Sequence, residues 1–174
     1  MTTTEDHADL PPTAPLAPDA FRTLLRRLAA TVVVVTADSY PPVGFTATSF
    51  TSVSLHPPLV SFCVDRSSSS WPAIRAARHV GIHLLSQRQE DVARRFAARG
   101  VDRFDGVEWH RGPHGVALLA DPLVWLVCRV AGRVDAGDHT IVLSEPVRGD
   151  LLDEAPPPLM YHMGGYLTAL PPTR

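Results

Sequence analysis

Residues 44–54, which read GFTATSFTSVS, have a composition that could form a ligand-binding surface. Small hydroxylated residues are unusually dense in this segment. A strand of this kind packs poorly by itself, but it can bring backbone N–H groups and short hydroxyls against a flat ligand. The same pattern also fits an edge strand with a polar outer face, and the residues alone leave both interpretations open.

Four consecutive serines, Ser67–Ser70, form a second candidate next to Arg66. They precede a predicted helix, and free N–H groups at a helix start, hydroxyls and a guanidinium can together bind an anion such as a phosphate. The alternative is a polar loop in which one serine caps the helix.

A third candidate is His139, which lies where the glycine turn Gly137-Asp138 meets a predicted strand. Imidazole titrates near neutral pH and serves in many active sites, although a histidine at a turn more often completes local hydrogen bonds.

Two pairs of histidines have a spacing of four residues, His79 with His83 and His110 with His114. On a strand such residues lie roughly 13 Å apart, at about 3.3 Å per residue, which is too far to share a metal ion. Since no third ligand and no cysteine pair of metal-binding spacing is evident, we expect no metal site.

The composition excludes several classes of function. All 16 basic residues are arginines, so mechanisms that need a lysine, such as a Schiff base or a Walker lysine, are excluded. Neither GxGxxG nor GxxxxGK[ST] occurs, which removes support for a Rossmann or P-loop nucleotide site. The formal net charge of −2 offers no basic field for nucleic acid, and we expect no such partner.

Local patterns predict the elements that must position these candidates. The predicted helices are an amphipathic one capped by Asp19, one starting at Trp71, and one opened by a capping box at 86–89 and ended by Gly100. The predicted strands are 31–36, 43–53, 59–64, 79–85, 123–134, 139–143 and 146–152, with a turn-rich segment at 106–115. This order predicts a mainly β fold, a small β-barrel with helical insertions, rather than alternating βαβ units.

The prolines and cysteines bear on domain organisation and compartment. Prolines cluster near both ends, which predicts a disordered N-terminal tail over 1–18, one domain over 19–170 and a short tail over 171–174. We expect no signal peptide, and prolines interrupt the uncharged stretch 39–64, so we expect no membrane-spanning helix. Cys63 and Cys128 lie in apolar runs, which predicts buried thiols in a reducing cytoplasm rather than a disulfide.

Taken in order, several segments resemble the flavin reductase family, whose members adopt the FMN-binding split β-barrel, a Greek-key fold. The resemblance extends from about Phe21 to Leu170. Residues 44–59 are similar to the family hallmark G-x-T-A-x-S-F-x-S-V-S-L-x-P-P-L, and 137–141 to its late G-D-H-x-I/L strand. The other matching segments are 21–36, 82–86, 95–97, 102–104 before Trp109, and Tyr161-His162 with Gly165-Tyr166.

The resemblance implies a role for each candidate. The residues that would contact the isoalloxazine ring of a flavin are Thr46, Ala47, Thr48, Ser49 and Ser52. The residues that would hold its ribityl chain or phosphate are Asp65, Arg66, Ser67, Ser68 and Ser70, with Phe96 and Phe104 bordering the pocket. His139 would be the catalytic residue that holds the nicotinamide nucleotide against the flavin, helped by Tyr166.

The implied reaction is hydride transfer from C4 of NADH or NADPH to N5 of FMN or FAD, in which the flavin supplies the chemistry and the protein orients the two rings. Reduced flavin would then pass to a separate monooxygenase, and a homodimer would close the flavin cleft. Thr48 stands where many members carry asparagine, which changes one contact to the ring but not the general site. Met163-Gly164 stands where many members carry a basic residue, so the choice between NADH and NADPH stays open. The alternatives are a split-barrel oxidase like pyridoxamine-phosphate oxidase and a flavin carrier without catalytic activity.

Overall fold

The computed structural model describes residues 15–153 and 156–169. The predicted tails, 1–18 and 171–174, therefore lie outside the described residues apart from 15–18. The helices are α1 (Pro18–Leu25), α2 (Trp71–Ala76) and α3 (Glu90–Ala97), with short 3₁₀ turns η1 (Gln87–Gln89) and η2 (Pro113–Gly115). The strands are β1 (Ala30–Thr31), β2 (Val33–Ala37), β3 (Gly44–Ala47), β4 (Thr51–Leu55), β5 (Pro58–Asp65), β6 (His79–Leu84), β7 (Trp109–Arg111), β8 (Ala117–Leu119), β9 (Val124–Ala136), β10 (His139–Leu151), β11 (Leu159–His162) and β12 (Gly165–Thr168).

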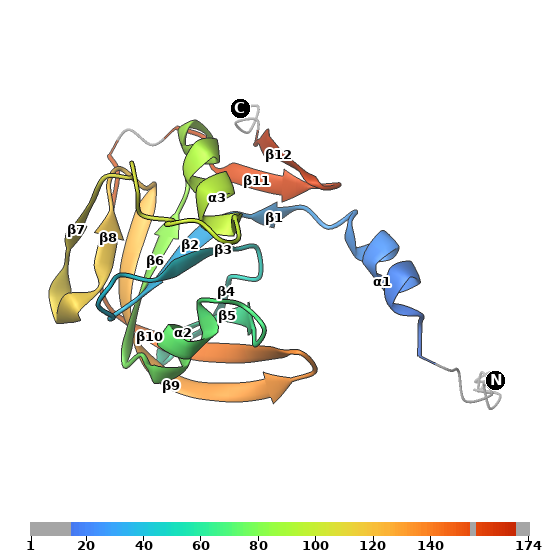
Figure 1. The fold of residues 1–174 in the computed structure, drawn as a ribbon, viewed down its shortest axis with the longest axis horizontal. Helices are drawn as coiled ribbons and strands as arrows, with labels where there is room; N and C mark the ends of the chain where they lie inside the picture. The colour runs from blue at the N-terminus through green and yellow to red at the C-terminus, as the bar shows by residue number, and fades with distance from the viewer. Residues whose placement is uncertain (1–14, 154–155, 170–174) are drawn as a thin grey trace, which may run out of the picture.

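Seven of the strands form one antiparallel sheet in the order β3-β2-β6-β9-β10-β5-β4, which curls on itself (Figure 1). Its two edges, β3 and β4, are consecutive in the chain but do not pair with each other. The barrel is therefore open between them. A smaller sheet, β1-β11-β12, and the hairpin β7-β8 pack outside it.

The strand β2 lies at the centre of the packing. All five of its residues are buried, as the run of β-branched residues predicts for a strand covered on both faces. Val33 and Val35 join one apolar cluster, while Val32 and Val34 join a second cluster with α3 and β11. Because strand side chains alternate, this one segment connects the barrel interior to the layer outside it.

Two predicted strands, 139–143 and 146–152, are one strand in the structure. β10 pairs with β9 from His139 opposite Ala136 to Leu151 opposite Val124, with register shifts after Leu143 and around Pro146. Such irregularities let a strand continue past a proline that has no N–H to donate. The result is the long hairpin that forms the lower edge of Figure 1, with His139 at the start of its second strand.

The predicted strand 43–53, in contrast, is two strands, because pairing stops at residues 48–50, where the chain crosses from one sheet edge to the other. The predicted strand 31–36 is likewise divided at Val32, whose N–H bonds to Leu159 O in the smaller sheet. Neither β8 nor the pair β11 and β12 was among the predicted strands.

Helix α3 confirms one predicted boundary and corrects the other. The capping box is present, because the Ser86 hydroxyl accepts from the first turn and the Gln89 side chain accepts from Ser86 N at 3.0 Å. The helix ends at Ala97, however, and Gly100 lies three residues farther on in a turn, with a φ of +71°.

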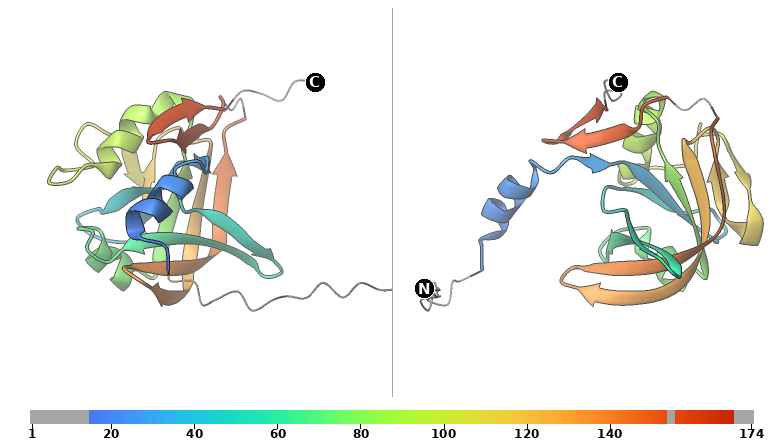
Figure 2. Two further views of the ribbon diagram at one scale, coloured as in Figure 1. Left: turned by 90° about the vertical axis from the view of Figure 1, so that its right-hand side faces the viewer. Right: turned by 180° about the vertical axis from the view of Figure 1, so that it is seen from behind.

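Helix α1 begins with Pro18, after Ala17 at the N-cap, so the predicted cap at Asp19 is wrong. Proline suits this position because its fixed φ is helical and its missing N–H costs nothing there. Asp19 lies in the first turn, where its carboxylate pairs with Arg22 at 2.8 Å. No residue of α1 is buried, and the helix stands away from the barrel in Figures 1 and 2.

None of the described helices is long and apolar enough to cross a membrane.

The fully buried side chain of His83 connects β6 to its neighbours. Its Nε2 accepts a hydrogen bond from Leu119 N at 3.2 Å, which places the ring hydrogen on Nδ1, and Nδ1 donates to Val34 O at 3.1 Å. Burial lowers the pKa of His83 from its ordinary value of 6.5 to about 4. The ring is therefore neutral at pH 7.

This histidine makes the fold sensitive to mild acid. Between pH 6.5 and pH 4 the unfolded chain binds a proton at His83 that the folded chain does not, so the free energy of unfolding falls as the pH is lowered through that range. We expect His83 to lower it by about 2 kcal/mol between pH 7 and pH 5. Urea unfolding at both pH values measures the change. His83→Gln removes the titrating group, and an unchanged pH dependence in that variant would contradict the assignment.

Candidate functional site

A cavity of about 500 Å³ lies at the opening of the barrel, between β3 and β5. Three other segments complete its wall: the serine loop after β5, the end of α3 with the loop that follows, and the start of β10. The lining residues are Phe45, Thr46, Ala47, Thr48, Ser49, Cys63, Asp65, Ser67, Ser68, Ser69, Phe96, Ala97, Arg99, Gly100, Arg103 and His139.

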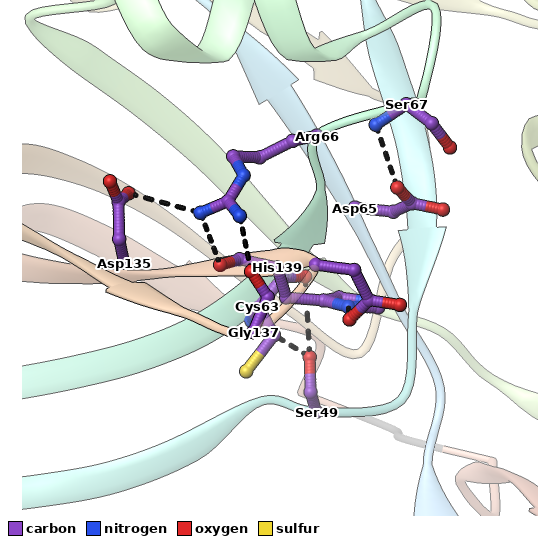
Figure 3. A network of polar contacts seen from close by, with 9 residues as sticks. Ser49, Cys63, Asp65, Arg66, Ser67, Asp135, Gly137 and His139 are labelled. Atoms are coloured by element: carbon purple, nitrogen blue, oxygen red, sulfur yellow. Dashed lines mark hydrogen bonds and ion pairs between the residues drawn. The ribbon is translucent and has the colours of Figure 1, made fainter. Parts of the chain in front are cut away.

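The crossing segment 48–50 is anchored by one hydroxyl. Ser49 Oγ accepts a hydrogen bond from Cys63 N at 2.9 Å and lies 3.4 Å from Cys63 O, so it replaces the strand partner that β5 lacks at this point (Figure 3). On the other side, Thr46 Oγ1 donates to Ala93 O at 2.7 Å and ties β3 to α3. These two contacts hold the hydroxyl-rich segment in place along the cavity.

The serine loop after β5 is built around Asp65. Its carboxylate accepts from Ser67 N at 2.7 Å, and its carbonyl accepts from Ser68 N at 3.0 Å. The hydrogen bonds from Ser67 lower the pKa of Asp65, and the nearby His139 and Arg99 lower it further. The loop thus presents an ionised carboxylate beside several serine hydroxyls.

Arg103 holds the end of the cavity together. Its guanidinium donates to Ala98 O at 2.9 Å, to Gly44 O at 2.8 Å and to Ser70 Oγ at 2.6 Å. It therefore joins the loop after α3, the start of β3 and the serine loop. Burial lowers the pKa of Arg103, and the positive charge of Arg99 lowers it further.

Arg99 is the second cation at this end. Its side chain is exposed and lines the cavity, and it makes no hydrogen bond or ion pair with any residue that the structure describes. Two guanidiniums close together repel each other, and an anion between them relieves that repulsion. This end of the cavity therefore favours a phosphate.

His139 lines the cavity from the start of β10 and is oriented by its neighbour. Its Nδ1 lies 2.7 Å from Asp138 Oδ1, and because a carboxylate accepts, Nδ1 donates and Nε2 is left to face a ligand. His139 and Thr48 also line a second cavity of about 880 Å³, bounded by α1 and β11. The imidazole thus stands between two adjoining spaces.

Within residues 15–153 and 156–169, no group of three or more histidine, cysteine or acidic side chains is arranged to hold a metal ion.

Comparison with known proteins supplies the family. Residues 25–169 match the model of the flavin reductase like domain. The chain belongs to this family. It is 44% identical over 156 residues to an NADH:FMN oxidoreductase of Rhodococcus erythropolis, covering 87% of this chain and 81% of that one. It is 34% identical over 158 residues to the reductase subunit of a flavin-dependent monooxygenase of Mycobacterium tuberculosis, covering 88% and 83%.

The fold of this flavin reductase-like chain is likewise similar to solved structures of the family. The NADH:FAD oxidoreductase of Streptomyces globisporus superimposes with a TM-score of 0.84 at 32% identity, covering 93% of this chain and 100% of that one. The predicted split β-barrel and the resemblance stated from the sequence are both confirmed.

The structure brings together most of the side chains that the resemblance assigned to flavin. Those that line the 500 Å³ cavity are Thr46, Ala47, Thr48, Ser49, Asp65, Ser67, Ser68, Phe96 and His139. They come from four separate segments, so the arrangement depends on the fold.

Arg66 is not among the cavity residues. Its guanidinium is directed to the β9–β10 turn, where it donates to Gly137 O and to His139 O and pairs with Asp135 at 3.5 Å (Figure 3). Arg66 therefore positions the backbone of His139, and Arg99 with Arg103 supply the cations that line the cavity.

Four other predicted residues also lie outside this cavity. Ser52 is exposed on β4, and Ser70 is buried with its hydroxyl donating to Gly44 O. Phe104 packs edge-on against Phe96, behind the cavity wall. Tyr166 lies on β12 beneath the Arg94 guanidinium, and Tyr161, against which it packs, lines the second cavity instead.

The cavity residues that sequence reasoning did not assign to the flavin site are Phe45, Cys63, Ser69, Ala97, Arg99, Gly100 and Arg103. Cys63 was predicted to be a buried thiol, but it is half-buried, whereas Cys128 is buried; both thiols are free. Two features of the sequence could have assigned the arginines to the cavity. Arg99-Gly100 follows the end of a predicted helix, and Arg103 lies in a segment that resembles the family.

The hydrogen bonds of Arg103 predict a stability effect. Arg103→Met keeps an apolar stem and leaves Gly44 O, Ala98 O and Ser70 Oγ without their charged donor. We expect the free energy of unfolding to fall by about 2–3 kcal/mol, as for buried hydrogen bonds to charged groups. Urea unfolding measures it, with the exposed Arg75→Met as the matched control. Equal losses in the two variants would contradict the role of Arg103.

Proposed function

We propose that this chain is an NAD(P)H-dependent flavin reductase that transfers a hydride from NADH or NADPH to FMN or FAD. The observation that carries the proposal is the cavity at the barrel opening, which is lined by serine and threonine hydroxyls, by the guanidiniums of Arg99 and Arg103 and by His139. Relatives that are NADH:FMN oxidoreductases and reductase components of monooxygenases support the same activity.

The residues present fit a flavin mononucleotide. Thr46, Ala47, Thr48 and Ser49 offer a narrow surface of small side chains and backbone on which a flat ring can lie. The volume is within the range of about 300–1,000 Å³ that is typical for ligand pockets. Ser67–Ser69, Arg99 and Arg103 would bind the phosphate through hydroxyls and guanidiniums.

The second cavity would receive the nicotinamide nucleotide. It adjoins the flavin cavity at Thr48 and His139, and it carries Arg22 and Arg26 of α1. His139, fixed by Asp138, would hold the nicotinamide against the flavin, so that the two rings meet in a geometry that allows transfer. The bound flavin supplies the redox chemistry, and the protein supplies binding, orientation and exclusion of water.

Reduced flavin would be consumed by a separate flavin-dependent monooxygenase. Reductase subunits of such enzymes are among the relatives, as is the flavin reductase component of a two-component tryptophan halogenase. Two free thiols in this chain suit a reducing compartment, and we propose a cytoplasmic location.

We propose further that the enzyme is a homodimer in which α1 packs against a second copy. On α1, Phe21 is 53% exposed and Leu24 is 61% exposed in the single chain. An apolar helix face of this kind is stable in water when a partner covers it.

One assay tests the activity. Oxidation of NADH and of NADPH is followed with and without added FMN, FAD or riboflavin. Strong dependence on free flavin supports the reductase. Flavin binding without nucleotide oxidation would favour a carrier, and oxidation of a pyridoxamine-phosphate-like substrate would favour the oxidase.

His139→Ala tests the catalytic assignment. We expect lower turnover or a higher Michaelis constant for the nicotinamide nucleotide, by about tenfold, because a positioning contact at the reacting ring is lost. Flavin binding, measured by fluorescence titration, should persist. Unchanged steady-state kinetics would contradict the role.

Leu24→Glu tests the dimer. Leu24 does not line the second cavity, unlike Phe21, Leu25 and Leu28, so the change alters the outer face of α1. We expect analytical ultracentrifugation to show a shift from dimer to monomer, because a buried carboxylate without a partner is costly. A monomeric unmodified chain would contradict the proposal.

A further inference from the structure

The turn that carries His139 lies at the surface, so local contacts must fix it. Residues 135–138, which precede His139, are all exposed, and Gly137 has a φ of +61° at the bend between β9 and β10. An exposed turn with little packing opens locally at a small cost in free energy. Because hydride transfer depends on how closely two rings are held together, His139 can position a nucleotide only if this turn is fixed.

Arg66 fixes the turn from the end of the neighbouring strand (Figure 3). Its guanidinium donates to Gly137 O and, at 3.2 Å, to His139 O, and its backbone N–H donates to Asp138 O at 3.1 Å. One residue therefore bonds to the carbonyls of three consecutive residues of the turn. A guanidinium suits this task because it has five N–H donors in a rigid planar fork.

Asp135 completes the arrangement from the other side of the turn. Its carboxylate lies 3.5 Å from the Arg66 guanidinium and accepts a hydrogen bond from Thr140 Oγ1 at 3.0 Å. Thr140 is fully buried, so this bond ties the carboxylate to the core of the sheet. An exposed ion pair stabilises a fold only slightly, but here it directs a guanidinium that also bonds to two carbonyls.

The geometry argues against a second role for Arg66 in the flavin cavity. Its neighbours Ser67 and Ser68 line that cavity, whereas the Arg66 guanidinium bonds to the turn. A guanidinium that turned toward a flavin phosphate would leave Gly137 O and His139 O without this charged donor, which costs free energy.

We propose that Arg66 and Asp135 are positioning residues for hydride transfer, which act on the nicotinamide nucleotide through His139 and not on the phosphate of the flavin. The proposal rests on the flavin reductase function proposed above. It replaces the phosphate contact that the resemblance implied for Arg66, and it gives Asp135 a part in the reaction.

The first test separates the nucleotide from the flavin. Arg66→Met keeps an apolar stem and removes the donors, so we expect kcat/KM for NADH to fall by about tenfold. The dissociation constants of FMN and of riboflavin, which has no phosphate, should keep their ratio in fluorescence titrations. Arg66→Lys should restore part of the lost activity, because an ammonium group can still donate to the turn. A larger ratio of the FMN constant to the riboflavin constant in Arg66→Met would overturn the proposal.

Arg129→Met is the matched control. Arg129 is an exposed arginine on the same hairpin, where it pairs with Glu145. Its replacement should leave both kcat/KM for NADH and the ratio of the flavin constants unchanged. Asp135→Asn should lower kcat/KM by about threefold, as for the loss of an exposed ion pair. Full activity in that variant would exclude the role of Asp135.

A double-mutant cycle tests whether Arg66 acts through His139. In a His139→Ala background, Arg66→Met should cause little further loss of kcat/KM, because the side chain that it positions is already absent. Equal losses in the two backgrounds would show that Arg66 acts elsewhere.

Amide hydrogen exchange gives a readout that does not depend on catalysis. Arg66→Met should speed up exchange over residues 135–140, whereas Arg129→Met should not. Unchanged exchange in Arg66→Met would contradict the contact of Arg66 with the turn. Failure of the proposed function is a separate outcome: the unmodified chain would then oxidise neither nucleotide with any flavin, and the exchange would still report on Arg66.

Discussion

The main constraint on this structure is that the seven-stranded sheet does not close between β3 and β4. A strand edge inside a barrel leaves backbone N–H and C=O groups without strand partners, and each such group that is buried and unsatisfied costs free energy. Side chains bind two such groups here: Ser49 Oγ accepts from Cys63 N of β5, and Arg103 donates to Gly44 O of β3. The contacts that satisfy the open edges of the sheet therefore also shape the cavity.

The long β9–β10 hairpin positions His139. His139 begins β10, and its backbone is held by Arg66, the residue after β5, and by pairing with Asp65. Its ring is oriented by Asp138, so backbone and side chain are fixed from different directions. A ring held in this way can stay between two cavities without being buried in the core.

Much of the site was predictable because its signals are local. The run TVVVVT predicts a buried strand, Ser86 and Gln89 predict a helix start, and the hydroxyl-rich segment marks one wall of the cavity. Patterns over five to ten residues predicted wrong strand boundaries where pairing between distant segments decides where a strand begins and ends. Residues 43–53 form parts of two strands because β3 pairs with β2 and β4 pairs with β5, so that β3 and β4 are the two opposite edges of the sheet. Residues 139–151 form one strand because the pairing with β9 continues across two register shifts.

The residue types and their order were sufficient for the mainly β fold, for the family and for the serines, threonines and histidine that line the cavity. They could not show which arginines face it. Arg66 lies beside the serines in the chain, yet its guanidinium donates to carbonyls of the β9–β10 turn, whereas Arg99 and Arg103 come from the loop after α3. A long side chain reaches whichever acceptors the fold brings within range, and some of those acceptors lie more than 50 residues away in the chain, as Gly44 O does from Arg103. That proximity exists only once the barrel has formed.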